Sequence, residues 1–224
     1  QRQMCIRDRK KSSQQLHMLR YTLTEQLIHG MEVSNLAYDL ARELGYEKEI
    51  CYELAKAGVL HDIGKIVLEN YVEEQDTLVV EEMRFVRTHS TLGYELLQGR
   101  GYSDFVLESI LYHHENANGS GPFGKTWEEI PLFSRIIHLS DLLDRAYGAK
   151  GFTEDIFNKA CGYLHKNEGT VVDKECVDAF LQAFPLPHFL TLGEDSFEKT
   201  LWEKIPRIKQ ELRFAQIEEL ASFF

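Results

Sequence analysis

Residues 57–66 read A-G-V-L-H-D-I-G-K-I. An apolar helical segment ends here in an adjacent histidine and aspartate, His61 and Asp62. A neutral imidazole and a carboxylate are both metal ligands, and a carboxylate can bridge two cations. An isolated His-Asp pair is more often a helix-terminal histidine followed by a capping aspartate, so the pair needs support from the rest of the sequence.

That support comes from further histidines and a carboxylate at helical positions. They are His29 upstream, His89 in R-T-H-S-T-L-G-Y-E-L-L (87–97), the paired His113 and His114, and Asp141 in S-R-I-I-H-L-S-D-L-L-D-R (134–145). Asp141 lies within an apolar helix, where a carboxylate is normally avoided. Each histidine alone is more often a surface or core residue than a ligand. Together these residues offer imidazoles and carboxylates from five helices, a mixture that suits Fe, Mn or Zn.

The spacing of apolar residues predicts an all-α fold, a helical bundle. The chain has five prolines in 224 residues, and most long segments repeat apolar residues with a helical period. The first expected helix follows a stripe from Leu23 to Leu40 and stops near Gly45. Further helices are expected at about 48–60, 81–98, 103–114, 131–147, 153–165 and 173–184. Residues 77–80 could form a strand, which is too short to build a sheet.

The chain divides into three parts on composition. Residues 1–12 show no apolar period and are interpreted as a tail outside the fold. Residues 13–184 form the expected domain, with a Gly-, Asn- and Ser-rich loop at 116–125. Residues 185–224 are interpreted as a break at 185–193 and a long amphipathic helix over 197–224, which leads towards a further domain. Phe184, Phe189 and Phe197 near the break would cover the domain or meet another chain.

Charge and cysteine content limit the partners and the compartment. The formal net charge is −11, which disfavours broad attraction to nucleic acid or anionic lipid. No apolar run approaches the roughly 18 residues of a membrane span, and no signal peptide is visible. The four cysteines are scattered without a C-x-x-C pair, as in reduced cytosolic proteins. We therefore expect a soluble, cytoplasmic protein.

The order H…HD-x-G-K…H…HH…D resembles the HD-GYP branch of the HD-domain phosphohydrolases. The resemblance runs from about Glu25 to Phe180 and includes the flanking sequences I-G-K-I, T-H-S-T-L-G-Y-E-L-L, H-H-E-N-A-N-G-S-G and I-P-L-F-S-R-I-I-H-L-S-D. The full set is far more specific than any one motif. It implies a metal-dependent phosphohydrolase with a bundle of helices around its metals.

The resemblance also implies a role for each residue. One metal would be held by His29, His61, Asp62 and Asp141, and an adjoining metal by His89, His113 and His114, with Asp62 bridging the two. Glu25 matches a position that helps to bind a third metal in some relatives, but an exposed helix carboxylate is an equal alternative. Asp62 and Lys65 would be catalytic, and Lys65, Gly119, Gly121 and Lys150 would contact the substrate. Fe or Mn is favoured over Zn.

Two segments depart from the family pattern. The family loop reads roughly D-G-S-G-Y-P, whereas residues 118–123 read N-G-S-G-P-F. A later R-P-Y segment is replaced by Lys150-Gly151-Phe152, and lysine lacks the two-pronged fork with which arginine binds a phosphate. The expected metal centre is complete, while the expected substrate contacts are altered.

Three functions remain open from the sequence. The first is a phosphodiesterase for a cyclic dinucleotide, with cyclic-di-GMP favoured by the resemblance. The second is an HD hydrolase of another nucleotide, and the third is a non-catalytic module that binds a nucleotide or a partner. A partner signalling domain or a second copy of the chain would be the protein partner.

Overall fold

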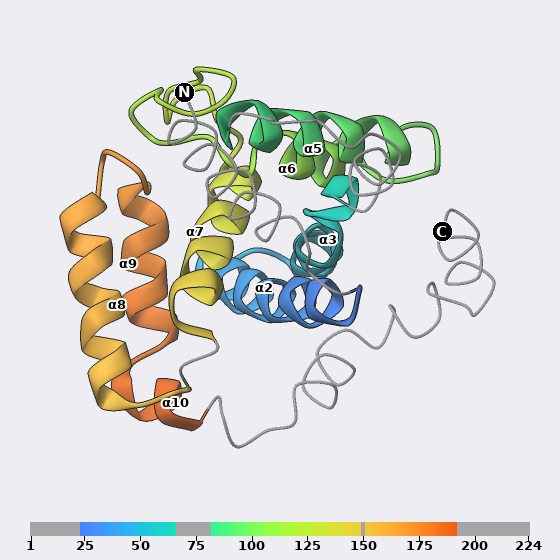
Figure 1. The fold of residues 1–224 in the computed structure, drawn as a ribbon. Helices are drawn as coiled ribbons and strands as arrows, with labels where there is room; N and C mark the ends of the chain where they lie inside the picture. The colour runs from blue at the N-terminus through green and yellow to red at the C-terminus, as the bar shows by residue number, and fades with distance from the viewer. Residues whose placement is uncertain (1–22, 66–81, 149–150, 192–224) are drawn as a thin grey trace, which may run out of the picture.

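The computed structural model describes residues 23–65, 82–148 and 151–191, with side chains from 26–65, 86–148 and 151–191. This part of the chain is helical and contains no β-strand, which confirms the predicted all-α class (Figure 1). The helices are α2 (Leu23–Glu43), α3 (Lys48–Leu60), α5 (Glu82–Leu97), α6 (Asp104–Tyr112), α7 (Leu132–Tyr147), α8 (Glu154–Asn167), α9 (Lys174–Ala183) and α10 (Leu186–Thr191).

The core lies where α2, α3, α6 and α7 meet. Helix α2 packs against α3, α7 and α9, and α6 packs against α3, α5 and α7. Figure 1 shows α7 running between the α2–α3 pair and the α8–α9 pair. Apart from Leu164 of α8, the largest fully buried aliphatic side chains among the described residues come from these central helices: Leu40, Leu54, Ile110, Ile136, Ile137 and Leu139. Burial of apolar surface therefore holds together the helices that carry the histidines.

Helices α2 and α3 approach each other at the level of their backbones. A Cβ atom at Gly58 of α3 would lie 2.6 Å from the Cα atom of Ser34, and one at Gly30 of α2 would lie 2.7 Å from the carbonyl oxygen of Val59. Real Cβ contacts are never so short, so only glycine fits at either position. This close crossing brings the segment around His29 against the end of α3, where the His-Asp pair lies.

The predicted helices agree with the observed ones, but the predicted break at 185–193 is wrong over the described residues. Helix α10 forms there and packs against α8. The ring of Phe189 is 6% exposed and lies 5.3 Å from the rings of Phe152 and Phe157. Phe184 is fully buried, so both phenylalanines cover the domain.

Other predictions fall outside the described residues: the tail at 1–12, the strand candidate at 77–80, Phe197 and the helix at 197–224. Among the helices that are described, none is both long enough and apolar enough to cross a membrane.

Candidate metal centre

Five helices bring together all seven ligands that were predicted for the two adjoining metals. His29 projects from α2, His89 from α5 and Asp141 from α7, while His61-Asp62 and His113-His114 follow the last residues of α3 and α6. Their ligand atoms form two groups, each within 4.8 Å: the His29 group (His29, His61, Asp62, Asp141) and the His89 group (Asp62, His89, His113, His114). The carboxyl ends of α3 and α6 point at the site, and helix dipoles favour cations there.

The His29 group has the spacing of ligands around one ion. The Nε2 atom of His29 lies 2.9 Å from Oδ1 of Asp141 and 3.7 Å from Oδ2 of Asp62. The Nε2 atom of His61 lies 3.4 Å from each of the same two oxygens. With metal–ligand bonds of about 2.0–2.2 Å, neighbouring ligands around an ion are about 3.0–3.4 Å apart.

The His89 group has the same spacing on the other oxygen of Asp62. Oδ1 of Asp62 lies 3.3 Å from Nε2 of His89 and 3.7 Å from Nε2 of His113. The Nε2 atom of His89 lies 3.4 Å from that of His113 and 3.1 Å from that of His114. The two oxygens of Asp62 thus face different groups, which is the arrangement of a bridging carboxylate.

Hydrogen bonds on the far side of the rings turn the histidines towards the centre. Nδ1 of His61 donates to the carbonyl oxygen of Gly58, and Nδ1 of His113 donates to that of Ile110, both at 2.7 Å. Nε2 is therefore the nitrogen that can bind a cation, as in most metal-binding histidines. Nε2 of His61 and Oδ1 of Asp62 are buried without a hydrogen-bond partner. Such atoms are costly unless a ligand satisfies them, so the residues fit a pair of metal ions.

Two cationic side chains of the chain itself contact the carboxylates. The Lys65 ammonium pairs with Oδ2 of Asp62. The Arg145 guanidinium lies 2.5 Å from Oδ1 of Asp141 through Nε and 2.9 Å from Oδ2 of Asp62 through Nη2. Burial alone would raise the pKa of each aspartate, but Lys65 beside Asp62 and Arg145 beside Asp141 outweigh it, with help from the histidines. Both carboxyl pKa values are held well below the usual range, so both groups are ionised.

The histidines of the two groups have opposite pKa shifts in the metal-free chain. Burial lowers the pKa of His61, but the charges and hydrogen bonds of Asp62 and Asp141 raise it to about 9. The same balance raises the pKa of His29, through Asp141 and Asp144. In the His89 group, burial lowers the pKa of His113 to about 3, and burial with the neighbouring histidines lowers that of His114. At neutral pH, His113 and His114 are therefore uncharged.

The glycine of the H-D-x-G-K motif permits this assembly. A Cβ atom at Gly64 would lie 1.9 Å from the carbonyl oxygen of His89 and 2.6 Å from the amide nitrogen of Gly93. The turn after α3 thus lies directly on the backbone of α5. Only glycine allows Asp62 to reach His89 in this way.

The loop after the paired histidines is held by Glu115, which the sequence analysis did not single out. This buried carboxylate accepts hydrogen bonds from the backbone amides of Phe123 (2.7 Å) and Lys125 (2.6 Å). Gly119 has a left-handed φ of 80°, and a Cβ atom at Gly121 would lie 2.6 Å from the Cα atom of Glu115. The two glycines predicted to contact substrate therefore shape the loop.

Two other predicted residues cannot be placed: the side chain of Glu25 and Lys150 lie outside the described residues. Conversely, no role was predicted for Asp144 or Arg145, which lie three and four residues, about one helical turn, beyond the candidate ligand Asp141 on α7. Nδ1 of His29 lies 2.5 Å from Oδ2 of Asp144. The signal was available, since positions three and four residues beyond Asp141 share its helix face.

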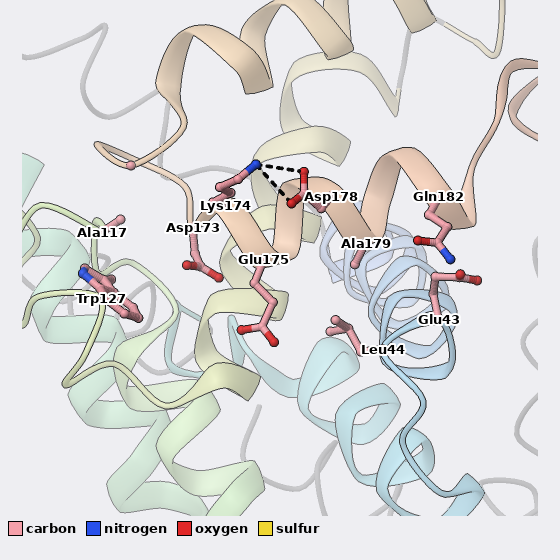
Figure 2. A pocket seen from close by; sticks show the side chains of 11 residues that line it. Glu43, Leu44, Ala117, Trp127, Asp173, Lys174, Glu175, Asp178, Ala179 and Gln182 are labelled. Atoms are coloured by element: carbon pink, nitrogen blue, oxygen red, sulfur yellow. Dashed lines mark hydrogen bonds and ion pairs between the residues drawn. The ribbon is translucent and has the colours of Figure 1, made fainter.

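A separate pocket lies between the end of α2, the start of α9 and the loop around Trp127 (Figure 2). Its lining is acidic, with Glu43, Asp173, Glu175 and Asp178 around a single lysine, Lys174, which pairs with Asp178 at 3.1 Å. No residue of the two ligand groups lines it.

Comparisons with known proteins agree with the geometry. A family model described as "HD domain" matches residues 5–176. The chain belongs to the HD-domain family. The resemblance predicted from the motifs is thereby confirmed.

Relatives of this HD domain include named phosphodiesterases. It is 34% identical over 155 residues to the cyclic di-GMP phosphodiesterase response regulator RpfG of Xanthomonas campestris pv. campestris, covering 67% of this chain and 41% of the relative. It is 29% identical over 176 residues to the 3'3'-cGAMP-specific phosphodiesterase 3 of Vibrio cholerae, covering 77% and 38%. The chain thus spans less than half of the length of these relatives.

A solved structure supports the fold. The crystal structure of a cyclic GMP-AMP specific phosphodiesterase of V. cholerae (V-cGAP3) matches with a TM-score of 0.61 at 19% identity, covering 77% of this chain and 48% of that one. At this identity the match establishes the helical HD fold alone.

Proposed function

We propose that this HD domain is a metal-dependent phosphodiesterase that hydrolyses a cyclic dinucleotide. The observation that carries the proposal is the pair of ligand groups joined through the two oxygens of Asp62. A divalent metal pair is suited to the hydrolysis of phosphate esters. The names of the relatives, which act on cyclic di-GMP or 3'3'-cGAMP, support a substrate of this class.

The ligands proposed are His29, His61, Asp62 and Asp141 for one metal and His89, His113, His114 and Asp62 for the other. Divalent ions bound here would acidify a water molecule and offset charge on the phosphate. The N and O donor set suits Fe or Mn, and also Zn. Glu25 remains a candidate for a third site.

The chain's own residues would orient and neutralise the substrate. Asp62 fixes the separation of the two groups because each of its oxygens faces one of them. Lys65, buried beside Asp62, supplies a positive charge where negative charge develops on the phosphoryl oxygens. Asp62 and Lys65 are therefore the proposed catalytic pair. Divalent ions held by the two ligand groups would also give this chain, whose net charge is −11, a local binding site for an anion.

Cyclic-di-GMP is the first substrate to test, with 3'3'-cGAMP as the alternative that the relatives suggest. The altered loop at 118–123 and Lys150 are the proposed determinants of this choice. Phe123 donates its amide to Glu115, a bond that the proline of the family loop at this position could not make.

The test is metal analysis of anaerobically purified protein combined with hydrolysis of cyclic-di-GMP, 3'3'-cGAMP and cyclic mononucleotides on the same sample. About two metals per chain with turnover of a cyclic dinucleotide is the expected result. Asp62→Ala should remove both metal and turnover while the helical circular dichroism persists, whereas the exposed-residue control Asp155→Ala should keep both. Full metal occupancy without turnover of any nucleotide would instead favour a binding module, and turnover by metal-free protein would refute the mechanism.

A further inference from the structure

A positively charged side chain of the protein already occupies the carboxylates of the His29 group. Nε of Arg145 lies 2.5 Å from Oδ1 of Asp141, and its Nη2 lies 2.9 Å from Oδ2 of Asp62. These are the same two oxygens that face the Nε2 atoms of His29 and His61. The guanidinium therefore bridges two carboxylates that a metal ion in this group would also bind.

The carboxylate oxygen of the His89 group, Oδ1 of Asp62, has no contact of this kind with an arginine or lysine among the described residues. Oδ1 of Asp62 is buried, makes no hydrogen bond and faces the Nε2 atoms of His89 and His113. Its other ligand atoms belong to imidazoles. Since no arginine or lysine among the described residues contacts Oδ1 of Asp62, a cation can bind this oxygen without displacing a guanidinium or an ammonium from it.

Lys65 does not bridge the two carboxylates of the His29 group in the way that Arg145 does. Its ammonium pairs with Oδ2 of Asp62 and forms no ion pair with Asp141 in the described part of the chain. Of the side chains that the structure describes, Arg145 is the one whose cation contacts both carboxylates. A guanidinium cannot lose its proton in a protein, so it has to move away as a cation when a second cation enters. The side chain is 37% exposed, which leaves it a route to solvent.

We propose that Arg145 is a built-in counter-cation of the His29 group, so that the two metal positions fill unequally. The His89 group binds its ion first and more tightly. The His29 group binds second, as the ion displaces the guanidinium from Asp62 and Asp141. This inference rests on the proposed function, because it assumes that both groups hold metals.

The experiment is a titration of the full metal-free chain with Mn²⁺, in which free Mn²⁺ is followed by electron paramagnetic resonance. The wild-type chain should show one tight and one weak site. In Arg145→Met, which keeps an apolar stem but removes the charge, the weak site should tighten at least about tenfold, the scale on which residues beside metal ligands act. The tight site should change less than about threefold. Arg42→Met, which removes an exposed arginine paired with Asp39, is the matched control and should change neither constant.

Further variants assign each binding constant to one ligand group and distinguish the loss of a contact from a folding defect. His114→Asn should abolish binding at the tight site, and His29→Asn should abolish binding at the weak site. Arg145→Lys keeps a charge but loses the two-pronged contact, so it should tighten the weak site by an intermediate amount. Two equal sites in the wild type, or unchanged constants in both Arg145 variants, would overturn the inference while leaving the metal centre intact. A wild-type chain that binds no Mn²⁺ and no Zn²⁺ would overturn the proposed function and this inference together.

Discussion

Nδ1 of His29 lies 2.5 Å from Oδ2 of Asp144, a residue three positions beyond Asp141 on α7. The contact turns Nε2 of His29 towards Asp141, at 2.9 Å, and towards the shared centre. One helix face thus supplies both a candidate ligand and the carboxylate that orients another ligand. Carboxylate partners of this kind fix the ring of a metal-binding histidine and strengthen its basicity.

Asp144→Asn should therefore weaken metal binding without removing any ligand. We expect affinity at the His29 group to fall about 10- to 100-fold, since outer-shell partners act on this scale. Isothermal titration with Mn²⁺ would measure it. Asp155→Asn, which changes an exposed carboxylate on α8, should have no effect. Unchanged affinity in Asp144→Asn would mean that the His29 ring is held by other contacts.

Gly64→Ala should damage the centre through the backbone. Its Cβ atom would lie 1.9 Å from the carbonyl oxygen of His89, so the turn or α5 has to move. We expect a loss of about 2 kcal/mol or more in the free energy of unfolding, measured by urea denaturation, because overpacking costs about 1–3 kcal/mol. Metal affinity should fall as Asp62 moves away from His89.

The matched control for this change is Gly162→Ala in α8, where the added Cβ atom meets nothing within 4 Å. Alanine has the higher helix propensity, so this variant should gain roughly 0.5–1 kcal/mol. Equal changes in the free energy of unfolding of Gly64→Ala and Gly162→Ala would contradict the close-contact explanation for Gly64.

Glu115→Ala should release the loop at 116–126 from the end of α6. The change leaves the amides of Phe123 and Lys125 without their acceptor. Their hydrogen exchange should accelerate, and the free energy of unfolding should fall by about 2 kcal/mol, as expected for lost bonds to a charged group. Glu115→Gln keeps one carbonyl acceptor, so its exchange rates and its free energy of unfolding should lie between those of the wild type and those of Glu115→Ala. Full metal content in both variants is expected, and exchange as slow as in the wild type would exclude this role for Glu115.

Metal binding at the two groups should depend differently on pH. The pKa of His61 is raised to about 9 and that of His29 is also raised, so below that range an ion in the His29 group has to displace protons. Its affinity should rise with pH, by up to about tenfold per pH unit for each proton displaced, and level off near pH 9. The pKa of His113 is lowered to about 3 and that of His114 is lowered as well, so the His89 group should show little change between pH 6 and 9.

Calorimetric titration with Mn²⁺ in buffers of different ionisation enthalpy measures these protons directly. At pH 7 the second ion should release at least about one more proton from the ligands than the first. Equal proton release in both steps would contradict the opposite pKa shifts of the two groups.

Local sequence patterns were sufficient to predict the helices and the identity of the candidate ligands. The helices follow from a local apolar period. The order H…HD-x-G-K…H…HH…D can be recognised in the sequence because each motif is short. The sequence also indicated that Asp62 would bridge, through the resemblance to a family. The break expected at 185–193 was wrong because the early turns of a helix tolerate proline, and Pro187 lies in the first turn of α10.

The packing of the helices, in contrast, sets which oxygen of Asp62 faces which ligand group and which side chains surround the two groups. Asp144 gains its role because α7 packs against α2, and Arg145 gains its role because α7 also lies beside the end of α3, where Asp62 follows. Glu115 gains its role because the loop folds back over the end of α6. These contacts join residues up to 115 positions apart. The helical period places Asp144 and Arg145 on the same face as Asp141, but it does not encode which residues of other helices they contact. Those contacts depend on how closely the helix backbones approach, which glycines such as Gly58 and Gly64 permit.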